Sequence, residues 1–367
     1  MGSPTPTMRG WIPESRWSRL GLAAAFVAVA GVLFWWRGPD WGQVGNAFRV
    51  VSWSWIWAAV GLNLLSVFVR SFAWRTVIDH SMPPPHPRYR SVFSAFSIGL
   101  LGNAVLPGRI GELARVAVLA RKLPRGRGMW ATLVGTVFAH RVFDLVAVIA
   151  LIAFVAATAE IPEWALTGLL IVVIVGLLLL AFSFAGARRH QRSVLDGLGR
   201  VRLLVTMARH GLGVMREPLG AGGAVLFQCA GWGFQLLAVY AAMRGFRIDE
   251  PLAAAGLVLL LMNAATIVTL WPGNVGLLQA AVALPLVGYG IDYAHGFAFG
   301  IGLQAVEASV GVALGLIFLA REGISFATLR QMPEGGPVEA AAATAVAGRA
   351  ASTAIEDRAR SRARVPG

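Results

Sequence analysis

Three groups of polar residues interrupt long apolar stretches of this 367-residue sequence. They are Asn103, Arg109, Glu112 and Arg115; then His140, Arg141 and Asp144; then Asn263, Asn274, Gln279, Gln304 and Glu307. An ionisable side chain within a lipid bilayer is costly, so it is expected to face protein, water or a ligand. These groups therefore contain the candidate site residues.

The first group follows a helix-breaking pair, Pro107-Gly108. A helix that restarts near Arg109 would point its free N–H groups and positive dipole end toward the break. Glu112 and Arg115 are three residues apart and can pair on that helix. The arrangement suits an anion such as a lipid phosphate, which arginine binds through two N–H groups. The alternative is that Arg109 and Arg115 belong to a basic belt at headgroup depth.

The second group also contains a pair three residues apart, Arg141 and Asp144. It either takes part in the same anion site or forms an internal ion pair that fixes its helix to a neighbour. His140 can titrate near neutral pH, which by itself is weak support for proton coupling.

The third group is mostly neutral, so its chemistry differs from that of the first two. Glu307 has no obvious basic partner in its own half of the chain. We expect it to pair with Arg141 or Arg115 from the other half, or to hold a proton.

None of these groups resembles a catalytic centre. The sequence has no nucleophile elbow, no Walker loop and no metal-binding His/Glu helix. Its single cysteine, Cys229, allows neither a disulfide framework nor a cysteine-based metal site. We therefore expect no enzymatic activity, no cofactor and no metal.

The composition identifies the elements that must position these residues. Hydrophobic residues make up 57% of the chain and charged residues 14%, and the mean hydropathy is +0.67. Soluble domains contain about 25% charged residues. The net charge of +14 is spread between apolar segments, which argues against a nucleic-acid partner. The fold class predicted is an all-α polytopic membrane protein.

A spanning helix needs about 20 apolar residues. Six stretches are predicted to be full spans: 20–36, 50–69, 129–158, 164–187, 218–243 and 293–320. Segments 88–122 and 251–289 do not fit simple spanning. The second lies in a charge-free run of 41 residues, 251–291, which as one helix would be about 60 Å long, twice the thickness of the hydrocarbon. Both segments are predicted to be re-entrant, broken helical hairpins. Their hinge residues would be Pro107, Gly108, Gly111, Pro272, Gly273 and Gly276.

Charge asymmetry between the loops predicts the orientation. Segment 188–216 has seven arginines against one acidic residue, and segment 109–127 is also basic. By the positive-inside rule both segments and both termini are cytoplasmic, in what we expect to be the bacterial cytoplasmic membrane. The predicted organisation is a cytoplasmic N-terminal segment (1–19), a transmembrane domain (20–322) and a disordered cytoplasmic tail (323–367).

The two hairpins share a sequence pattern. Residues 107–119 align without gaps on residues 272–284, and Arg141-x-x-Asp144 corresponds to Gln304-x-x-Glu307 at nearly the same offset. Because the hairpins are predicted to enter from opposite sides, the pattern indicates an inverted repeat. The alternative is a chance alignment of Ala-, Val- and Leu-rich segments.

Three motifs carry a resemblance to a known family. They are Asn103…Leu106-Pro107-x-Arg109-x-Gly111-Glu112-x-x-Arg115, then Arg141-x-x-Asp144, then Pro272-Gly273-Asn274-x-Gly276. Over roughly residues 15–325 the sequence resembles the lysylphosphatidylglycerol synthase transmembrane region, or flippase-like, family. The resemblance implies a module that moves a lipid between leaflets. It also implies that the charged residues of the first two groups form a headgroup site.

The sequence departs from the family pattern in two places. The family often has Pro-Gly-Gly-x-Gly followed by an acidic residue, where this chain has Asn274 and Gln279. A soluble synthase domain is not recognisable after the transmembrane region, so we expect no synthesis of aminoacyl-lipid.

The resulting hypothesis is a lipid translocase for a lipid with an anionic or phosphate-bearing headgroup, bound between the two hairpins. The alternative is a non-transporting, lipid-binding scaffold for a separately encoded lipid or glycosyl transferase. The expected partners are thus a membrane lipid and, in the alternative, a transferase. The predicted substrate-binding residues are Asn103, Arg109, Glu112, Arg115, His140, Arg141, Asp144, Asn274, Gln279, Gln304 and Glu307.

Overall fold

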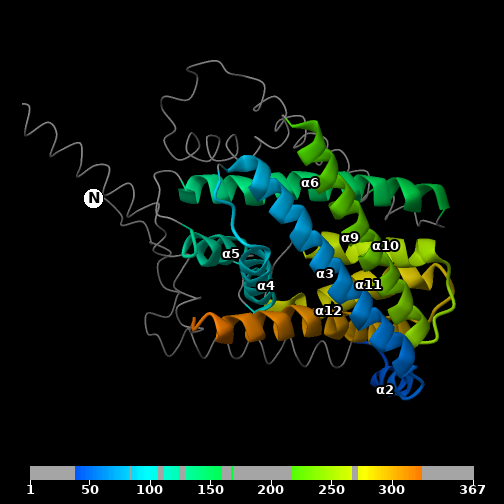
Figure 1. Ribbon diagram of the computed structural model, residues 1–367. Coiled ribbons are helices and arrows are strands. Elements are labelled where there is room, and N and C mark those ends of the chain that lie inside the picture. The colour runs from blue at the N-terminus through cyan, green and yellow to red at the C-terminus, as the bar shows by residue number, and fades with distance from the viewer. Residues whose placement is uncertain are drawn as a thin grey trace, which may run out of the picture.

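The computed structural model describes residues 38–82, 84–105, 111–123, 129–158, 167, 217–266 and 272–324. All secondary structure within these ranges is helical (Figure 1). Four helices are long and apolar enough to cross a membrane: α3 (Trp53–Ser81), α6 (Met129–Thr158, from Thr132 on), α9 (Pro218–Gly245) and α12 (Tyr293–Arg321). The chain is therefore a multi-pass membrane protein.

These helices correspond to four of the six predicted spans. The predicted spans 20–36 and 164–187 lie outside the described residues, as do segment 1–19 and nearly all of the tail 323–367. Helix α3 continues past the predicted end at residue 69 as far as Ser81, and in this added part Arg75 pairs with Asp79 one turn later (Nε–Oδ2, 3.2 Å).

Both predicted hairpins consist of two short helices that pack together. The first is α4 (Tyr89–Val105) with α5 (Gly111–Ala120). The second is α10 (Leu252–Ala265) with α11 (Leu277–Val287), joined through the short helix η3 (Pro272–Asn274). In Figure 1 the first hairpin lies toward the left end of α6 and α12, and the second lies toward the right.

Glycines shape both hairpins. At the tip of the second, Gly273, Asn274 and Gly276 have φ values of 74°, 43° and 91°, a backbone region that glycine adopts most readily. Gly276 precedes α11, and its N–H donates to Gln279 Oε1 (2.6 Å). In the first hairpin a Cβ on Gly111 would lie 2.0 Å from the Gly99 carbonyl oxygen. Only glycine allows this approach of α5 to α4.

Helices α3 and α9 cross closely at their centres. Ser66 Oγ donates to the Gly231 carbonyl oxygen (2.7 Å), and these residues are 165 positions apart in the chain. The same separation relates Pro107 to Pro272 in the two hairpins. Small residues permit the crossing, because a Cβ on Gly231 would lie 2.3 Å from Arg70 Cγ.

The helices form a first set (α3, α4, α5 and α6) and a second set (α9, α10, α11 and α12). When each helix is exchanged for its counterpart in the other set, the same helix contacts are found, which is called the exchange pattern below. Within the first set α3–α4, α4–α5, α5–α6 and α3–α6 are in contact, and each of these contacts has its counterpart in the second set. Between the sets, α4–α12 matches α6–α10, and α3–α12 matches α6–α9. Because α3 and α9 are counterparts, the contact between them is unchanged when the two sets are exchanged.

Side-chain contacts define the two ends of the bundle. At one end, Glu322 after α12 accepts hydrogen bonds from Lys122 after α5 and from Ser94 of α4. At the other end, His295 of α12 bonds to the Phe246 carbonyl oxygen after α9 (2.7 Å), and Ser52 N–H before α3 donates to Gly245 O (2.8 Å). The amphipathic helix α2 (Trp41–Arg49), capped by Asp40, lies at this second end (Figure 1).

Candidate functional site: a polar cavity between the hairpins

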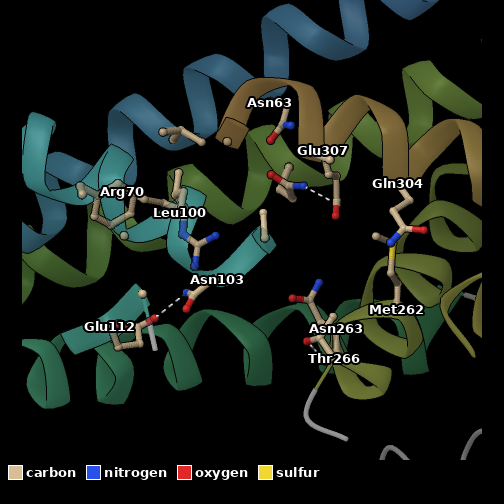
Figure 2. Close-up of a pocket in the computed structure, with 18 of the residues that line it drawn as sticks. Asn63, Arg70, Leu100, Asn103, Glu112, Met262, Asn263, Thr266, Gln304 and Glu307 are labelled. Atoms are coloured by element: carbon tan, nitrogen blue, oxygen red, sulfur yellow. Dashed lines mark hydrogen bonds between the residues drawn. The ribbon is translucent and has the colours of Figure 1, made fainter. Parts of the chain in front are cut away.

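A cavity of about 380 Å³ lies where the two hairpins meet the long helices. Eight of the predicted site residues line it: Asn103, Glu112, Arg115, His140, Arg141, Asn274, Gln304 and Glu307. Figure 2 shows Asn103 and Glu112 on one side of the space, with Asn263, Gln304 and Glu307 on the other. The fold thus brings together residues that are far apart in the sequence.

Arg115 of α5 is buried beneath this cavity, with its guanidinium carbon 4.7 Å from the ring centre of Trp74 and 5.5 Å from that of Phe96. Its terminal nitrogen lies 2.5 Å from Glu112 Oε2, so the predicted pair is present. The Arg115 Nε has no hydrogen-bond partner among the described residues. Because buried N–H groups are normally satisfied, this donor marks a place for a ligand atom or water.

Glu112 connects the first hairpin to α6. It pairs with Arg141 as well as with Arg115, and its Oε1 accepts a bond from Asn103 Nδ2 (3.3 Å). The carboxylate is therefore the common partner of two arginines. It holds both guanidinium groups at the wall of the cavity.

Asp144 was predicted to bind substrate, but it is buried behind the cavity wall and does not line the space. Its carboxylate receives Arg70 (2.9 Å), Arg141 (2.8 Å), Trp232 Nε1 (2.9 Å) and Gln228 Nε2. Donors from α3, α6 and α9 thus use the oxygens that a ligand would need. In this arrangement Asp144 positions Arg70 and Arg141, and its predicted contact with substrate stays a prediction.

Arg70 is a cavity residue that the sequence analysis missed. It lines the space from α3, its guanidinium carbon lies 5.4 Å from the Trp232 ring centre, and its Nε has no partner within the described ranges. It was missed because the predicted span 50–69 stopped one residue before it. The signal in the sequence that could have identified it is a basic residue directly after an apolar run.

The second set contributes amides and one carboxylate. Glu307 Oε1 accepts from Gln235 Nε2 (2.7 Å), and not from Arg141 or Arg115 as expected. Those two arginines are held by Glu112 and Asp144 instead. Gln235 was also missed, because nothing in the sequence shows which face of α9 meets α12.

Gln279 and Gln304 stabilise the tip of the second hairpin. Gln279 Nε2 donates to Gln304 Oε1 (2.5 Å), and Gln304 Nε2 donates to the Gly273 carbonyl oxygen (2.5 Å). Gln304 lines the cavity, whereas Gln279 is buried away from it. The hydrogen bonds of Gln279 thus hold the hairpin tip, and its predicted role in substrate binding stays a prediction.

The remaining predicted residues are placed as follows. His140 lines the cavity and packs edge-on against Phe96, with 6.1 Å between ring centres. Asn274 donates to the Ala265 carbonyl oxygen (3.3 Å) across the second hairpin tip. Pro107, Gly108 and Arg109 lie outside the described residues.

The described ranges contain no cluster of three or more His, Cys, Asp or Glu residues that could hold a metal ion. The cavity offers charged and neutral hydrogen-bonding groups around a space open to a small ligand.

No curated protein and no solved structure matches the chain. A family model does match: the lysylphosphatidylglycerol synthase TM region, over residues 20–315. This match covers most of the sequence and includes both hairpins, α3, α6 and α9, α12 as far as residue 315, and every residue that lines the cavity. With its apolar spanning helices and its polar cavity between two broken hairpins, the chain belongs to the lysylphosphatidylglycerol synthase TM region family.

Proposed function

We propose that the chain is a lipid translocase, which moves a lipid with an anionic or phosphate-bearing headgroup between leaflets. One observation carries the proposal: Arg70, Arg115 and Arg141 line a single cavity among helices apolar enough to cross a membrane. Such charges are expensive in a bilayer and mark binding sites or transport pathways.

The state of these arginines supports a phosphate ligand. Arg115 and Arg70 each keep a buried Nε without a partner in the described part of the chain. Arginine matches phosphate oxygens through parallel N–H groups. Glu112 would then be displaced in part from Arg115 and Arg141 as the phosphate enters, which links headgroup binding to the contact between α5 and α6.

The exchange pattern supports alternating access. We propose that the two sets form an inverted repeat, in which Arg70–Asp144 corresponds to Gln235–Glu307 and Ser66 meets its own counterpart, Gly231. Rocking of one set against the other would open the cavity to each side in turn.

The charges at the two ends support the proposed orientation, with both termini cytoplasmic. The end that contains Lys122 also contains Arg121 and Arg321 against Glu322, whereas the other end contains Asp249, Glu250 and Asp292 against Arg244 and Arg247. Basic residues accumulate on the cytoplasmic side. In this orientation the first hairpin enters from the cytoplasm and the second from outside.

The experiment reconstitutes the purified protein in vesicles with fluorescent phosphatidylglycerol and follows leaflet exchange by quenching the label in the outer leaflet. Arg115→Gln should slow exchange about tenfold or more, because loss of a charged hydrogen bond costs about 1.5–3 kcal/mol. Glu112→Gln should also slow it, because both arginines lose their common partner. Arg49→Gln, an exposed change on α2, is the matched control and should exchange like wild type.

Equal exchange rates for Arg115→Gln and wild type at equal incorporation would exclude the assigned site. The rival function is a non-transporting scaffold for a separate transferase. It would be supported if the wild-type protein failed to move any labelled anionic lipid and a transferase co-purified with it in stoichiometric amount.

A further inference from the structure

The side of the cavity nearest the second set carries hydrogen-bonding side chains that have no part in the proposed phosphate site. The carboxamides that line it include one from each of three helices: Asn63 of α3, Gln235 of α9 and Asn263 of α10. In Figure 2, Asn63 and Glu307 lie across the space from Asn263. This group of carboxamides and Glu307 is called the amide face below.

Each of the three carboxamides uses one N–H within the protein. Asn63 donates to the Val306 carbonyl oxygen (3.4 Å), and Asn263 donates to that of Leu259 (2.9 Å). Gln235 donates to Glu307 Oε1 (2.7 Å). A carboxamide has two N–H donors and one carbonyl acceptor. Among the described residues, each of the three therefore keeps one N–H and its carbonyl oxygen for a ligand.

A carboxamide with both a free N–H donor and a free carbonyl acceptor favours a ligand group that can accept and donate hydrogen bonds. A phosphate oxygen only accepts hydrogen bonds and an ammonium group only donates them, whereas a hydroxyl group does both. We propose that the amide face binds the hydroxyl groups of a polyhydroxylated phospholipid headgroup, of the glycosyl, inositol or glycerol class. The inference rests on the proposed function, since it assigns the phosphate of the same lipid to Arg70, Arg115 and Arg141.

The carboxamides and not the carboxylates favour hydroxyl groups over an amine, because an ammonium group would leave the free N–H donors of the amides without an acceptor. Glu112 is paired with Arg115 and Arg141, and Asp144 is paired with Arg70 and Arg141. Among the described residues, Glu307 is thus the cavity carboxylate whose partner is an amide and not an arginine. Glu307 and the neutral amides together suit a pair of hydroxyl groups. The second oxygen of Glu307 can accept a hydrogen bond from one hydroxyl group, while the amides donate to and accept from the other.

The size of the cavity agrees with this assignment. At about 380 Å³ it lies near the lower end of the range of about 300–1,000 Å³ for small-molecule sites. It can enclose a phosphate with a small polyol or one ring, with the acyl chains outside.

The test measures binding of short-chain phosphatidylinositol, phosphatidic acid and phosphatidylethanolamine to the full-length protein in detergent, by competition and native mass spectrometry. Phosphatidylinositol should bind about tenfold more tightly than phosphatidic acid, as two or more neutral hydrogen bonds would give. Asn263→Leu and Asn63→Leu should each reduce this ratio severalfold. Arg115→Gln should weaken both lipids and leave the ratio near its wild-type value.

The outcomes separate the inference from the proposed function. Equal affinities of wild type for phosphatidylinositol and phosphatidic acid would overturn the amide-face assignment and leave the phosphate site standing. Tightest binding of phosphatidylethanolamine would overturn it in favour of an ammonium ligand at Glu307. Absence of binding for all three phospholipids would remove both. Each ratio comes from one folded sample, so lower stability of one variant does not imitate a loss of selectivity.

Discussion

Asp144 shows how one buried carboxylate behind the cavity wall can position arginines that line the cavity. It neutralises Arg70 and Arg141 and also receives Gln228 and Trp232 from α9. Asp144→Asn would leave two guanidinium groups without their shared counter-charge. We expect a loss of stability of about 1–3 kcal/mol, below the cost for a fully buried pair, because the side chains of Arg70 and Arg141 are 23% and 41% exposed and Arg141 keeps Glu112 as a second partner. Unfolding in detergent, followed by circular dichroism, measures it.

The control for Asp144→Asn is Asp249→Asn. Asp249 also pairs with an arginine, Arg244, but its side chain is 75% exposed. An exposed pair contributes about 0–1 kcal/mol. If the two variants unfolded at the same temperature, the network around Asp144 would not stabilise the bundle.

At the residue scale, pairs within one helix could be predicted and pairs between helices could not. Glu112–Arg115 and Arg141–Asp144 follow from a spacing of three residues, which places both side chains on one helix face. Arg70–Asp144 and Gln235–Glu307 depend on which helices pack and at what rotation. The sequence therefore indicated the charged half of the cavity better than its amide face.

At the element scale, the first hairpin depends on the close approach of α5 to α4. A Cβ on Gly111 would lie 2.0 Å from Gly99 O and 2.6 Å from Asn103 N, and these backbone atoms cannot move apart without separating the helices. We expect Gly111→Ala to destabilise the protein by about 1–3 kcal/mol or more. Gly61→Ala in α3 is the matched change, because a Cβ there meets nothing within 4 Å.

Gly61→Ala should be neutral or stabilise α3 by up to about 1 kcal/mol, the difference in helix propensity between glycine and alanine. Thermal unfolding of both variants in one detergent gives the comparison. A Gly111→Ala variant as stable as Gly61→Ala would mean that α4 and α5 do not pack as closely as described.

Glu322 holds the ends of α12, α4 and α5 together. Burial raises the pKa of its carboxyl group, but the hydrogen bonds from Lys122 and Ser94 and the charge of Lys122 outweigh this, so the pKa falls below its ordinary value of 4.5. In the unfolded chain the pKa returns to that value. The contribution of Glu322 to stability is thus present above pH 4.5 and is lost as the pH falls through the lower folded pKa.

Glu322→Gln should therefore lower the unfolding temperature near neutral pH and flatten its decrease on acidification. Unfolding temperatures of wild type and variant across the acidic range measure the difference. Glu250→Gln, at the opposite end of the bundle, should keep the wild-type slope. The same slope in Glu322→Gln would show that the contact with Lys122 contributes nothing measurable.

The elements themselves were largely predictable. The second hairpin is interrupted at Pro272-Gly273 as the sequence predicted, and the apolar runs marked the four described spans; Pro107-Gly108 lies outside the described residues. The C-terminal half of α3 was not predicted, since charged residues from Arg70 on lower its hydropathy although the helix continues to Ser81. Hydropathy measures the preference for lipid, and this segment contacts protein and the end of the bundle instead.

At the scale of the whole molecule, the contact between the two sets determines whether the cavity can change sides. Helix α4 of the first set packs on α12 of the second, where a Cβ on Gly311 would lie 3.6 Å from Leu100 Cβ. This separation falls within the range of about 3.5–4.5 Å found in disulfides. Cysteines at these two positions can therefore join the sets across the cavity.

The final prediction concerns this cross-link. In a Cys229→Ser background, which removes the single native cysteine, the double variant Leu100→Cys/Gly311→Cys should exchange labelled lipid when reduced and stop when oxidised. If the sets must rock against each other, a covalent bond between α4 and α12 fixes one arrangement and prevents the second. Reduction should restore the rate, so each sample provides its own control for folding and incorporation. Continued exchange in the fully oxidised protein would mean that the lipid passes without separation of α4 from α12, and the inverted repeat would then be a feature of architecture and not of mechanism.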